Sequence, residues 1–299
     1  MRALALALLA PVACALAQSI EPRAYANAPV GLNFLLAGYA QSRGGVGFDA
    51  TSPLENGQVS VHTLPLAYVR TLDVLGNFGS ISLVLPFAGL SGSATLDGSA
   101  EVKREISGMA DPALRLAVNF HGAPAMKAAQ FASYRQDLIV GASLLVTAPW
   151  GQYDPDRLVN LGTNRWSIKP ELGVSQALGA WTVELAAGAT FFSANDRYFR
   201  GNTREQDPLY SAQLHLIRQL GRGTWAAVSA SHYEGGRTTL NDAARDDRQA
   251  GSRFGLTFSL PIARQQSLKL FANSGLYART GTDFDSVGLA WQYLWGEDS

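Results

Sequence analysis

Apolar and polar residues alternate along most of the chain beyond its N-terminal region. In residues 181–191 every odd position is apolar, while the even positions carry Thr, Glu, Ala, Gly and Thr. Residues 252–260 repeat the pattern, with Phe254, Leu256 and Phe258 on one face. A period of two is typical of a β-strand whose two faces meet different surroundings. The pattern therefore predicts an all-β protein with little helix.

Turn residues divide the alternating pattern into about twelve predicted strands. Besides the two segments above, these cover residues 30–43, 58–71, 77–89, 109–121, 137–149, 165–178, 209–220, 224–235, 268–278 and 287–295. The connections are alternately long (44–57, 90–107, 150–164, 194–208 and 236–250) and short (72–76, 179–180, 221–223 and 262–265). Two connections break this order: 122–134, where we expect one or two helical turns within 125–131, and 280–283. Short periplasmic turns and long extracellular loops are typical of outer-membrane barrels.

The second face of these strands distinguishes a membrane barrel from a soluble β-sandwich. In a sandwich that face meets water and carries many charges, whereas here it is rich in Gly, Ser, Asn and Thr, and only 16% of the chain is charged. The apolar face carries aromatic residues toward the segment ends, namely Trp150, Trp166, Trp181, Trp225, Tyr293 and Trp295. Such aromatic girdles flank the lipid-facing band of membrane barrels. We therefore expect a transmembrane antiparallel β-barrel.

The first residues have the features of a cleavable signal peptide. Residues 1–2 are a short positive start, residues 3–13 are mainly apolar, and residues 15–17 (Ala-Leu-Ala) fit the small-x-small cleavage rule. The single cysteine, Cys14, lies within this segment. The alternative is that Cys14 carries the lipid of a lipoprotein.

These features divide the chain into three predicted parts. We expect residues 1–17 to be the signal peptide, residues 18–28 a periplasmic segment, and residues 29–299 the outer-membrane barrel. Pro22 and Pro29 make the middle part a poor strand, because proline cannot donate a ladder hydrogen bond. This segment could instead lie inside the barrel as a plug.

Several motifs resemble one family of outer-membrane transporters. Residues 21–34, EPRAYANAPVGLNF, resemble the opening of the phenol-degradation MetA-pathway family. Further similar stretches, spread over nearly the whole mature chain, are 108–112, 141–151, 160–166, 169–173 and 206–210. The resemblance implies an outer-membrane β-barrel with a transport role for aromatic or other hydrophobic compounds. It brings no agreed catalytic or binding residues.

Polar residues on the faces opposite the apolar ones are the candidate lining of the lumen. They are Asn33, Arg115, Asn119, Lys169, Glu171, Glu184, Arg253, Lys269 and Asn273. Lys169 and Glu171 share one strand face and Glu184 lies on the next strand, so we expect these opposite charges to pair. Two interpretations remain open: a polar constriction that a solute must pass, and a packed salt-bridge network that only stabilises the barrel.

Candidate catalytic, cofactor and metal chemistry is sparse. Ser60 and His62 share a strand face and are the best candidates for the serine and histidine of a lipid-hydrolysing site. Ser231 and His232 are adjacent in sequence, so they point to opposite faces and cannot form such a pair. Loop residues that offer oxygen ligands for calcium, but are typical of solvated loop tips, are Asp154, Asp156, Asn241, Asp242, Asp246 and Asp247. We assign no catalytic, cofactor-binding or metal site.

The sequence thus predicts an outer-membrane channel, not an enzyme, for passive or facilitated uptake of small hydrophobic or aromatic compounds. The alternatives are a structural or adhesive barrel, and a barrel enzyme that acts on lipids. Expected partners are outer-membrane lipid and lipopolysaccharide, the barrel-assembly machinery through the aromatic C-terminal strand, and a small hydrophobic solute. With 24 basic and 24 acidic side chains and no basic cluster, the chain is not expected to bind nucleic acid.

Overall fold

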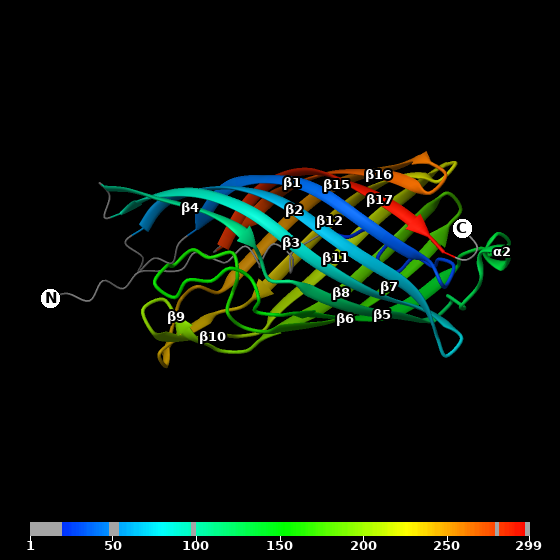
Figure 1. The fold of residues 1–299 in the computed structure, drawn as a ribbon. Coiled ribbons are helices and arrows are strands. Elements are labelled where there is room, and N and C mark those ends of the chain that lie inside the picture. Colours follow the sequence, from blue (N-terminus) through cyan, green and yellow to red (C-terminus); the bar gives the residue numbers. More distant parts are fainter. Residues whose placement is uncertain (1–19, 48–53, 97–99, 279–280, 297–299) are drawn as a thin grey trace.

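The computed structural model describes residues 20–47, 54–96, 100–278 and 281–296. They form an antiparallel β-barrel whose strands are tilted against the barrel axis (Figure 1). The strands of the wall are β1 (Asn33–Gly47), β2 (Leu54–Val74), β3 (Asn77–Leu96), β4 (Ala100–Met109), β5 (Ala113–His121), β6 (Leu138–Thr147), β7 (Ser167–Leu178), β8 (Trp181–Phe192), β11 (Leu209–Gly221), β12 (Thr224–Gly235), β15 (Gln249–Ala263), β16 (Gln266–Ala278) and β17 (Gly281–Trp295).

These thirteen strands occupy twelve places in the wall because β4 and β5 share one place. Both pair with β3, β5 along its first half and β4 along its second half. The ring closes because β1 pairs with β17, and β2 pairs with both β1 and β3. The prediction of an antiparallel barrel of about twelve strands is confirmed.

The two faces of each strand differ as the alternating pattern predicts. Leu172 and Leu185 are 63% and 52% exposed on the outer face, whereas Glu184 points inward and is 1% exposed. A continuous outer band of exposed apolar side chains is unfavourable in water and is typical of a lipid-facing surface. The outer faces of the strands therefore form the membrane-facing band.

The aromatic residues near the strand ends do not all face outward. Trp150 and Trp166 are 67% and 46% exposed and contact each other edge to face. The prediction is wrong for Trp225, which is 8% exposed and packs inside the barrel against Ile217. Because β12 exposes Val228 on its outer face, strand alternation places Trp225, three positions earlier, on the inner face.

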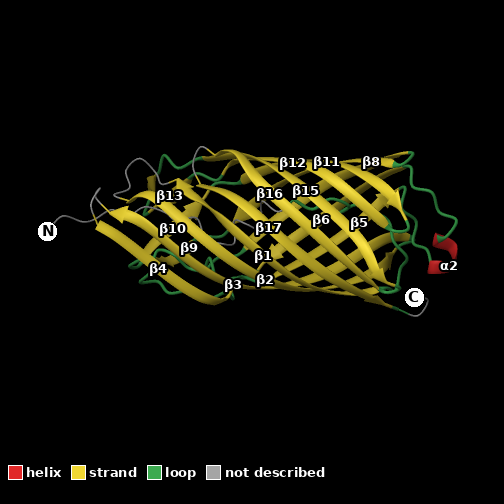
Figure 2. Cartoon of the chain, turned by 90° about the horizontal axis from the view of Figure 1, so that it is seen from above, coloured by secondary structure: helices red, strands yellow, loops and turns green. Residues whose placement is uncertain are grey.

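The two ends of the barrel differ in their connections. At the end where β1 begins and β17 finishes, called here the short-turn end, β2 and β3 are joined by Leu75 and Gly76. Their φ angles of 53° and 84° are typical of a type I′ turn. The longer connection at this end contains α2 (Ala128–Phe131), a single turn within the predicted helical stretch (Figure 2). No helix in the described part of the chain has the length and apolarity of a membrane span.

The opposite end, called here the long-loop end, contains more strand than predicted. Much of the expected loops 44–57 and 90–107 is instead extended hairpin, since β3 runs to Leu96 and β4 begins at Ala100. Four short strands also pair there as a second sheet, namely β9 (Asn195–Tyr198), β10 (Asn202–Gln206) and β13 (Thr238–Leu240), which Figure 2 labels, and the unlabelled β14 (Ala243–Ala244). Pairing of this kind satisfies backbone groups that a purely solvated loop would leave to water.

Candidate functional site

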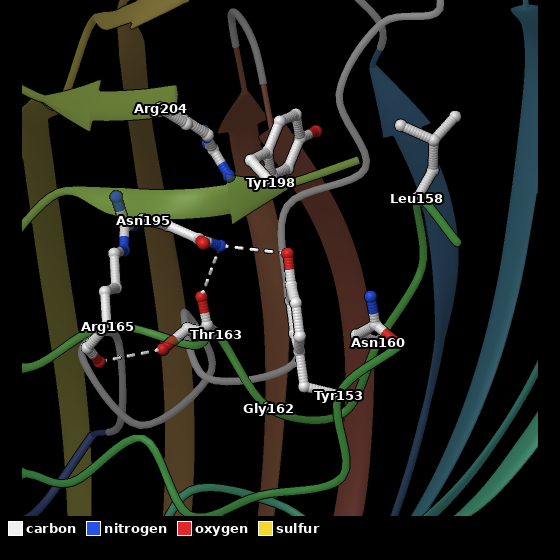
Figure 3. A pocket seen from close by; sticks show the side chains of 9 residues that line it. All are labelled: Tyr153, Leu158, Asn160, Gly162, Thr163, Arg165, Asn195, Tyr198 and Arg204. Carbon is white, nitrogen blue, oxygen red and sulfur yellow. Dashed lines mark hydrogen bonds between the residues drawn. The ribbon is translucent and has the colours of Figure 1, made fainter. Parts of the chain in front are cut away.

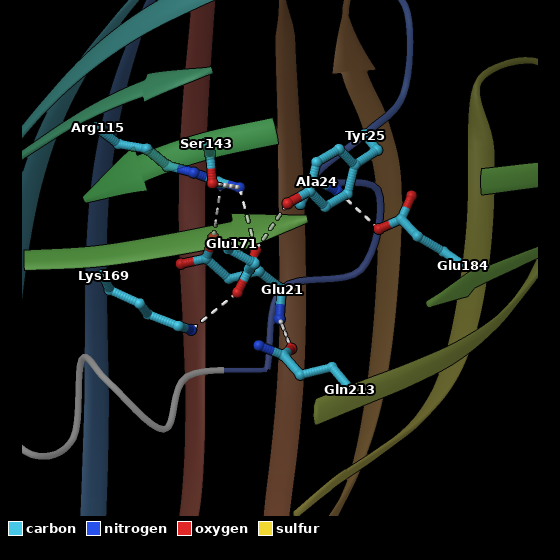
Figure 4. Close-up of polar contacts among 9 residues, drawn as sticks. All are labelled: Glu21, Ala24, Tyr25, Arg115, Ser143, Lys169, Glu171, Glu184 and Gln213. Atoms are coloured by element: carbon cyan, nitrogen blue, oxygen red, sulfur yellow. Dashed lines mark hydrogen bonds and ion pairs between the residues drawn. The ribbon is translucent and has the colours of Figure 1, made fainter. Parts of the chain in front are cut away.

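The described N-terminal residues 20–32, called here the N-terminal segment, lie inside the barrel (Figure 4). Tyr25 is completely buried, and its ring lies so close to Gly173 of β7 that a Cβ there would overlap it. Residues 20–28, which the sequence predicts to be periplasmic, thus lie in the lumen. This is the position that the alternative prediction of a plug gives them. Pro22 and Pro29 explain this arrangement, because a segment that cannot join a β-ladder must satisfy its polar groups elsewhere.

Side chains of the wall supply hydrogen bonds to the backbone of the N-terminal segment. The backbone N–H of Ala24 donates to Glu184 Oε1 at 3.0 Å. Asn119 Nδ2 donates to the carbonyl oxygen of Tyr25 at 3.1 Å. Both wall residues are candidates from the sequence, and both hold the N-terminal segment. Glu184 thus accepts a hydrogen bond from a backbone amide, while Lys169 pairs with Glu171 instead.

Glu171 is the centre of a charge network in the lumen. Its Oε1 accepts a hydrogen bond from Tyr25 Oη at 3.0 Å, and its Oε2 lies 2.8 Å from Lys169 Nζ. Arg115 Nη2 lies 3.6 Å from Glu171 Oε1, and Arg115 Nη1 lies 3.2 Å from Glu21 Oε2 (Figure 4). The network therefore joins β5 and β7 to the N-terminal segment. The side chains of Lys169 and Glu171 are only 9% and 10% exposed, so this part of the network is buried.

Apolar residues of the N-terminal segment fill the lumen toward the short-turn end. Ala28 and Val30 pack against a buried cluster formed by Phe78, Ala123 and Ile139. Ala123 and Ile139 have no exposed surface. Apolar packing therefore holds the N-terminal segment against the inside of the wall at this end.

A cavity of about 390 Å³ lies beside the N-terminal segment in the middle of the barrel. One wall is mainly apolar and is formed by Leu36, Ala67, Val69, Val84, Ala113 and Leu145, together with Ser80 and Ser82. The polar lining residues include Arg115, Lys169, Glu171, Glu184, His215 and Lys269. Cavities of this size, with apolar walls and a few convergent polar groups, are typical of small-molecule sites.

Two further lumen candidates lie on the inner face away from this cavity. Arg253 is 8% exposed and donates through Nη2 to the carbonyl oxygen of Phe284 at 2.8 Å. Asn273 Oδ1 lies beside Gly255, close to Ile20 at the start of the N-terminal segment. Both residues therefore contact the interior without lining the main cavity.

Asn33 does not belong to the lumen, which corrects the prediction. Its Oδ1 accepts a hydrogen bond from Tyr68 Oη at 2.7 Å, and Tyr68 is 38% exposed on the outer face. Leu35 and Tyr39, at the following odd positions of β1, are also exposed outward. The alternation of β1 therefore places Asn33 on the outer face, at the short-turn rim.

The structure contains a buried Ser–His pair that the sequence pattern does not reveal. His215 Nδ1 lies 2.8 Å from Ser229 Oγ, and both residues are 1% exposed. They are register partners on β11 and β12. Their proximity depends on the register between β11 and β12, which the sequence does not show. The sequence indicates only that each residue lies on the inward-facing side of its own strand.

The catalytic and metal candidates from the sequence have other partners. His62 Nδ1 bonds to Tyr39 Oη at 2.7 Å, and His232 Nδ1 bonds to Ser252 Oγ at 2.9 Å. Asp154 accepts from a backbone amide of its own loop and lies near an exposed arginine. Within the described ranges, no three His, Cys, Asp or Glu side chains gather as a metal-binding cluster.

The connection between β6 and β7 folds into the long-loop end. Leu161 of this connection is completely buried and packs in a cluster with Leu90 of β3. Asp111, between β4 and β5, holds the base of the connection: its Oδ1 accepts from Gly151 N at 2.8 Å, and its Oδ2 accepts from Thr163 N and Oγ1 at 2.8 and 2.7 Å. This connection thus extends into the lumen from the long-loop end, and Asp111 is one of its anchors.

Replacing Asp111 with alanine is expected to release this connection and lower the free energy of unfolding by about 2 kcal/mol, because bonds to a buried charged group are lost. Trypsin should then cut faster at Arg157, which is exposed in the same connection. Asp156→Ala, at an exposed position of that connection, is the control. Equal protease resistance of both variants would contradict the anchoring role.

Comparison with known proteins agrees with this architecture. The family model described as "Putative MetA-pathway of phenol degradation" matches residues 41–291, which confirms the resemblance. An outer membrane channel from Pseudomonas putida F1 is similar in structure, with a TM-score of 0.79 and 24% identity over 93% of this chain and 100% of that one.

More distant barrels share the fold. The transport unit of the autotransporter AIDA-I from Escherichia coli has a TM-score of 0.53 and 8% identity over 87% of this chain and 89% of that one. The β domain of the Bordetella autotransporter BrkA has a TM-score of 0.51 and 12% identity over 87% and 98%. No curated protein sequence matches the chain. Because the family model covers most of its length, the chain belongs to the phenol-degradation MetA-pathway family.

Proposed function

We propose that this protein is an outer-membrane channel for passive or facilitated uptake of small hydrophobic or aromatic compounds. The central cavity carries the proposal, because its volume of about 390 Å³ and its apolar wall suit such a solute. Membership of the family and similarity to an outer membrane channel support the location and favour a channel over an enzyme. We also propose that β17, with its alternating aromatic residues, is the strand that the barrel-assembly machinery recognises.

The proposed route follows the barrel axis from the long-loop end to the short-turn end. In outer-membrane barrels the long loops face outward and the short turns face the periplasm. A solute passes the connection that carries Leu161, occupies the cavity against its apolar wall, and leaves when the N-terminal segment moves. A concentration gradient is sufficient to drive this passage. The lumen residues around Glu171 then act as the polar side of the constriction that the solute must pass.

Uptake by whole cells tests the proposal. Deleting the gene is expected to slow the initial uptake of radiolabelled toluene, because hydrophobic solutes then lack a route through the outer membrane, and a plasmid copy should restore it. Uptake of radiolabelled glycerol, a small polar solute, should not change. Equal toluene uptake with and without the protein would contradict the proposal, and loss of surface attachment in the deletion strain would support the adhesive alternative.

A further inference from the structure

A second pocket, here called the outer pocket, lies at the long-loop end between the β6–β7 connection and the β9–β10 hairpin (Figure 3). Its free space of about 10 Å³ suits one water-sized group. The polar side chains that line it include Tyr153, Asn160, Arg165, Tyr198 and Arg204. None of the described residues that line it is acidic. The pocket is therefore cationic in character and separate from the central cavity.

Two polar groups of the outer pocket lack partners among the described residues. Arg204 is 6% exposed, and its Nε has no hydrogen-bond partner there. Tyr198 is also 6% exposed, and its Oη is likewise unpartnered within the described ranges. The Arg204 guanidinium lies 5.3 Å from the centre of the Tyr198 ring. Burial without partners is costly for both groups, so both favour an acceptor in the pocket.

Hydrogen bonds and ring contacts order the other residues of the outer pocket. Asn195 Nδ2 donates to Tyr153 Oη and to the carbonyl oxygen of Thr163, both at 3.0 Å (Figure 3). A second guanidinium, that of Arg165, lies over the ring of Phe192 at 4.3 Å and donates to a glutamine of β10. Burial raises the pKa of Tyr198, so its hydroxyl stays protonated and acts as a donor. The pocket thus presents prearranged donors and positive charge.

We propose that the outer pocket binds one oxygen of a carboxylate, so that the solutes of this channel include small aromatic carboxylates such as benzoate. The proposal rests on the proposed function and names a substrate class for it. A carboxylate oxygen accepts charge-assisted hydrogen bonds from Arg204 Nε and Tyr198 Oη, whereas a hydrocarbon leaves both unsatisfied. A neutral alcohol of the same shape offers no negative charge to the guanidinium.

Binding of benzoate to the purified, detergent-solubilised protein tests this proposal, by calorimetric titration at constant ionic strength. Tyr198→Phe removes one hydroxyl and keeps the ring, and it is expected to weaken benzoate binding about 10-fold. Arg204→Gln is expected to weaken it at least as much. Arg157→Gln removes an equal charge from an exposed position outside the pocket and should leave benzoate binding unchanged. A heat-dependent shift on gels checks that each variant is folded.

The outcomes separate this proposal from the proposed function. Benzoate binding that Tyr198→Phe weakens and Arg157→Gln spares supports the carboxylate site, provided that benzyl alcohol binding does not respond to Tyr198→Phe. Unchanged benzoate affinity in folded Tyr198→Phe and Arg204→Gln overturns it, as does binding of chloride with no binding of benzoate. Toluene uptake in cells that carry Tyr198→Phe should equal that of the wild type. The uptake assay therefore tests the proposed function separately from the carboxylate site.

Discussion

Replacing Gly173 with alanine is expected to expel the Tyr25 ring from the barrel wall and to raise the ionic conductance of the channel. The added Cβ would overlap three ring atoms of Tyr25, and overpacking of this kind costs about 1–3 kcal/mol when the surroundings cannot move. The N-terminal segment forms no strand of the wall, whereas β7 pairs with both β6 and β8, so the segment is expected to move before the strand does. Loss of the ring would widen the lumen beside Gly173 of β7.

Single-channel recording of the refolded protein in a planar bilayer measures this effect. Gly89→Ala is a matched control, because a Cβ at Gly89 of β3 meets only the Ser107 Cβ at 4.0 Å. Its conductance should equal that of the wild type. Unchanged conductance in a folded Gly173→Ala protein would show that Tyr25 does not restrict the route.

Replacing Glu171 with alanine is expected to lower the free energy of unfolding by about 3 kcal/mol, because it leaves buried positive charge without its partner. Lys169 loses a contact of 2.8 Å, Tyr25 loses the acceptor of its hydroxyl, and Arg115 loses one of its two carboxylates. Glu171→Gln keeps an acceptor for Tyr25 and should destabilise the barrel less. Because Tyr25 is released, conductance should also rise.

Urea unfolding, followed by the heat-dependent shift on gels, measures the stability change. The control is Glu101→Ala, since Glu101 pairs with Lys103 at 3.1 Å but both side chains are more than half exposed. Its expected cost is below about 0.5 kcal/mol, as for most surface ion pairs. A large stability loss with unchanged conductance would favour a purely stabilising network over a constriction, and the reverse result would favour a constriction.

Much of the wall could be predicted from the sequence because strand alternation is a local property. The inward positions of Lys169, Glu171 and Glu184 follow from the parity of the exposed residues Leu172 and Leu185 on the same strands. Turn signals at the short-turn end are local for the same reason, since positive φ angles at two successive residues complete a hairpin within four residues. The strand count and the antiparallel order both depend on such signals.

Local signals fail where a residue type suggests one face and its strand parity requires the other. Trp225 is aromatic and near a strand end, yet its neighbours on β12 place it inside. Asn33 is polar, yet β1 places it outside beside Tyr68. The environment of the whole strand decides which face each residue occupies. A single side chain cannot move to the other face unless the register of its strand shifts by one residue.

By itself, the sequence determined an outer-membrane type of barrel, its alternating faces, its hairpin order and its family. Only the tertiary structure decided what fills the lumen. Tyr25 meets Glu171 across 146 residues, and Asp111 holds Thr163 across 52, so no local pattern encodes either contact. These contacts form because buried polar groups must find partners wherever the closed wall brings them. The central cavity and the outer pocket are the spaces that those contacts leave.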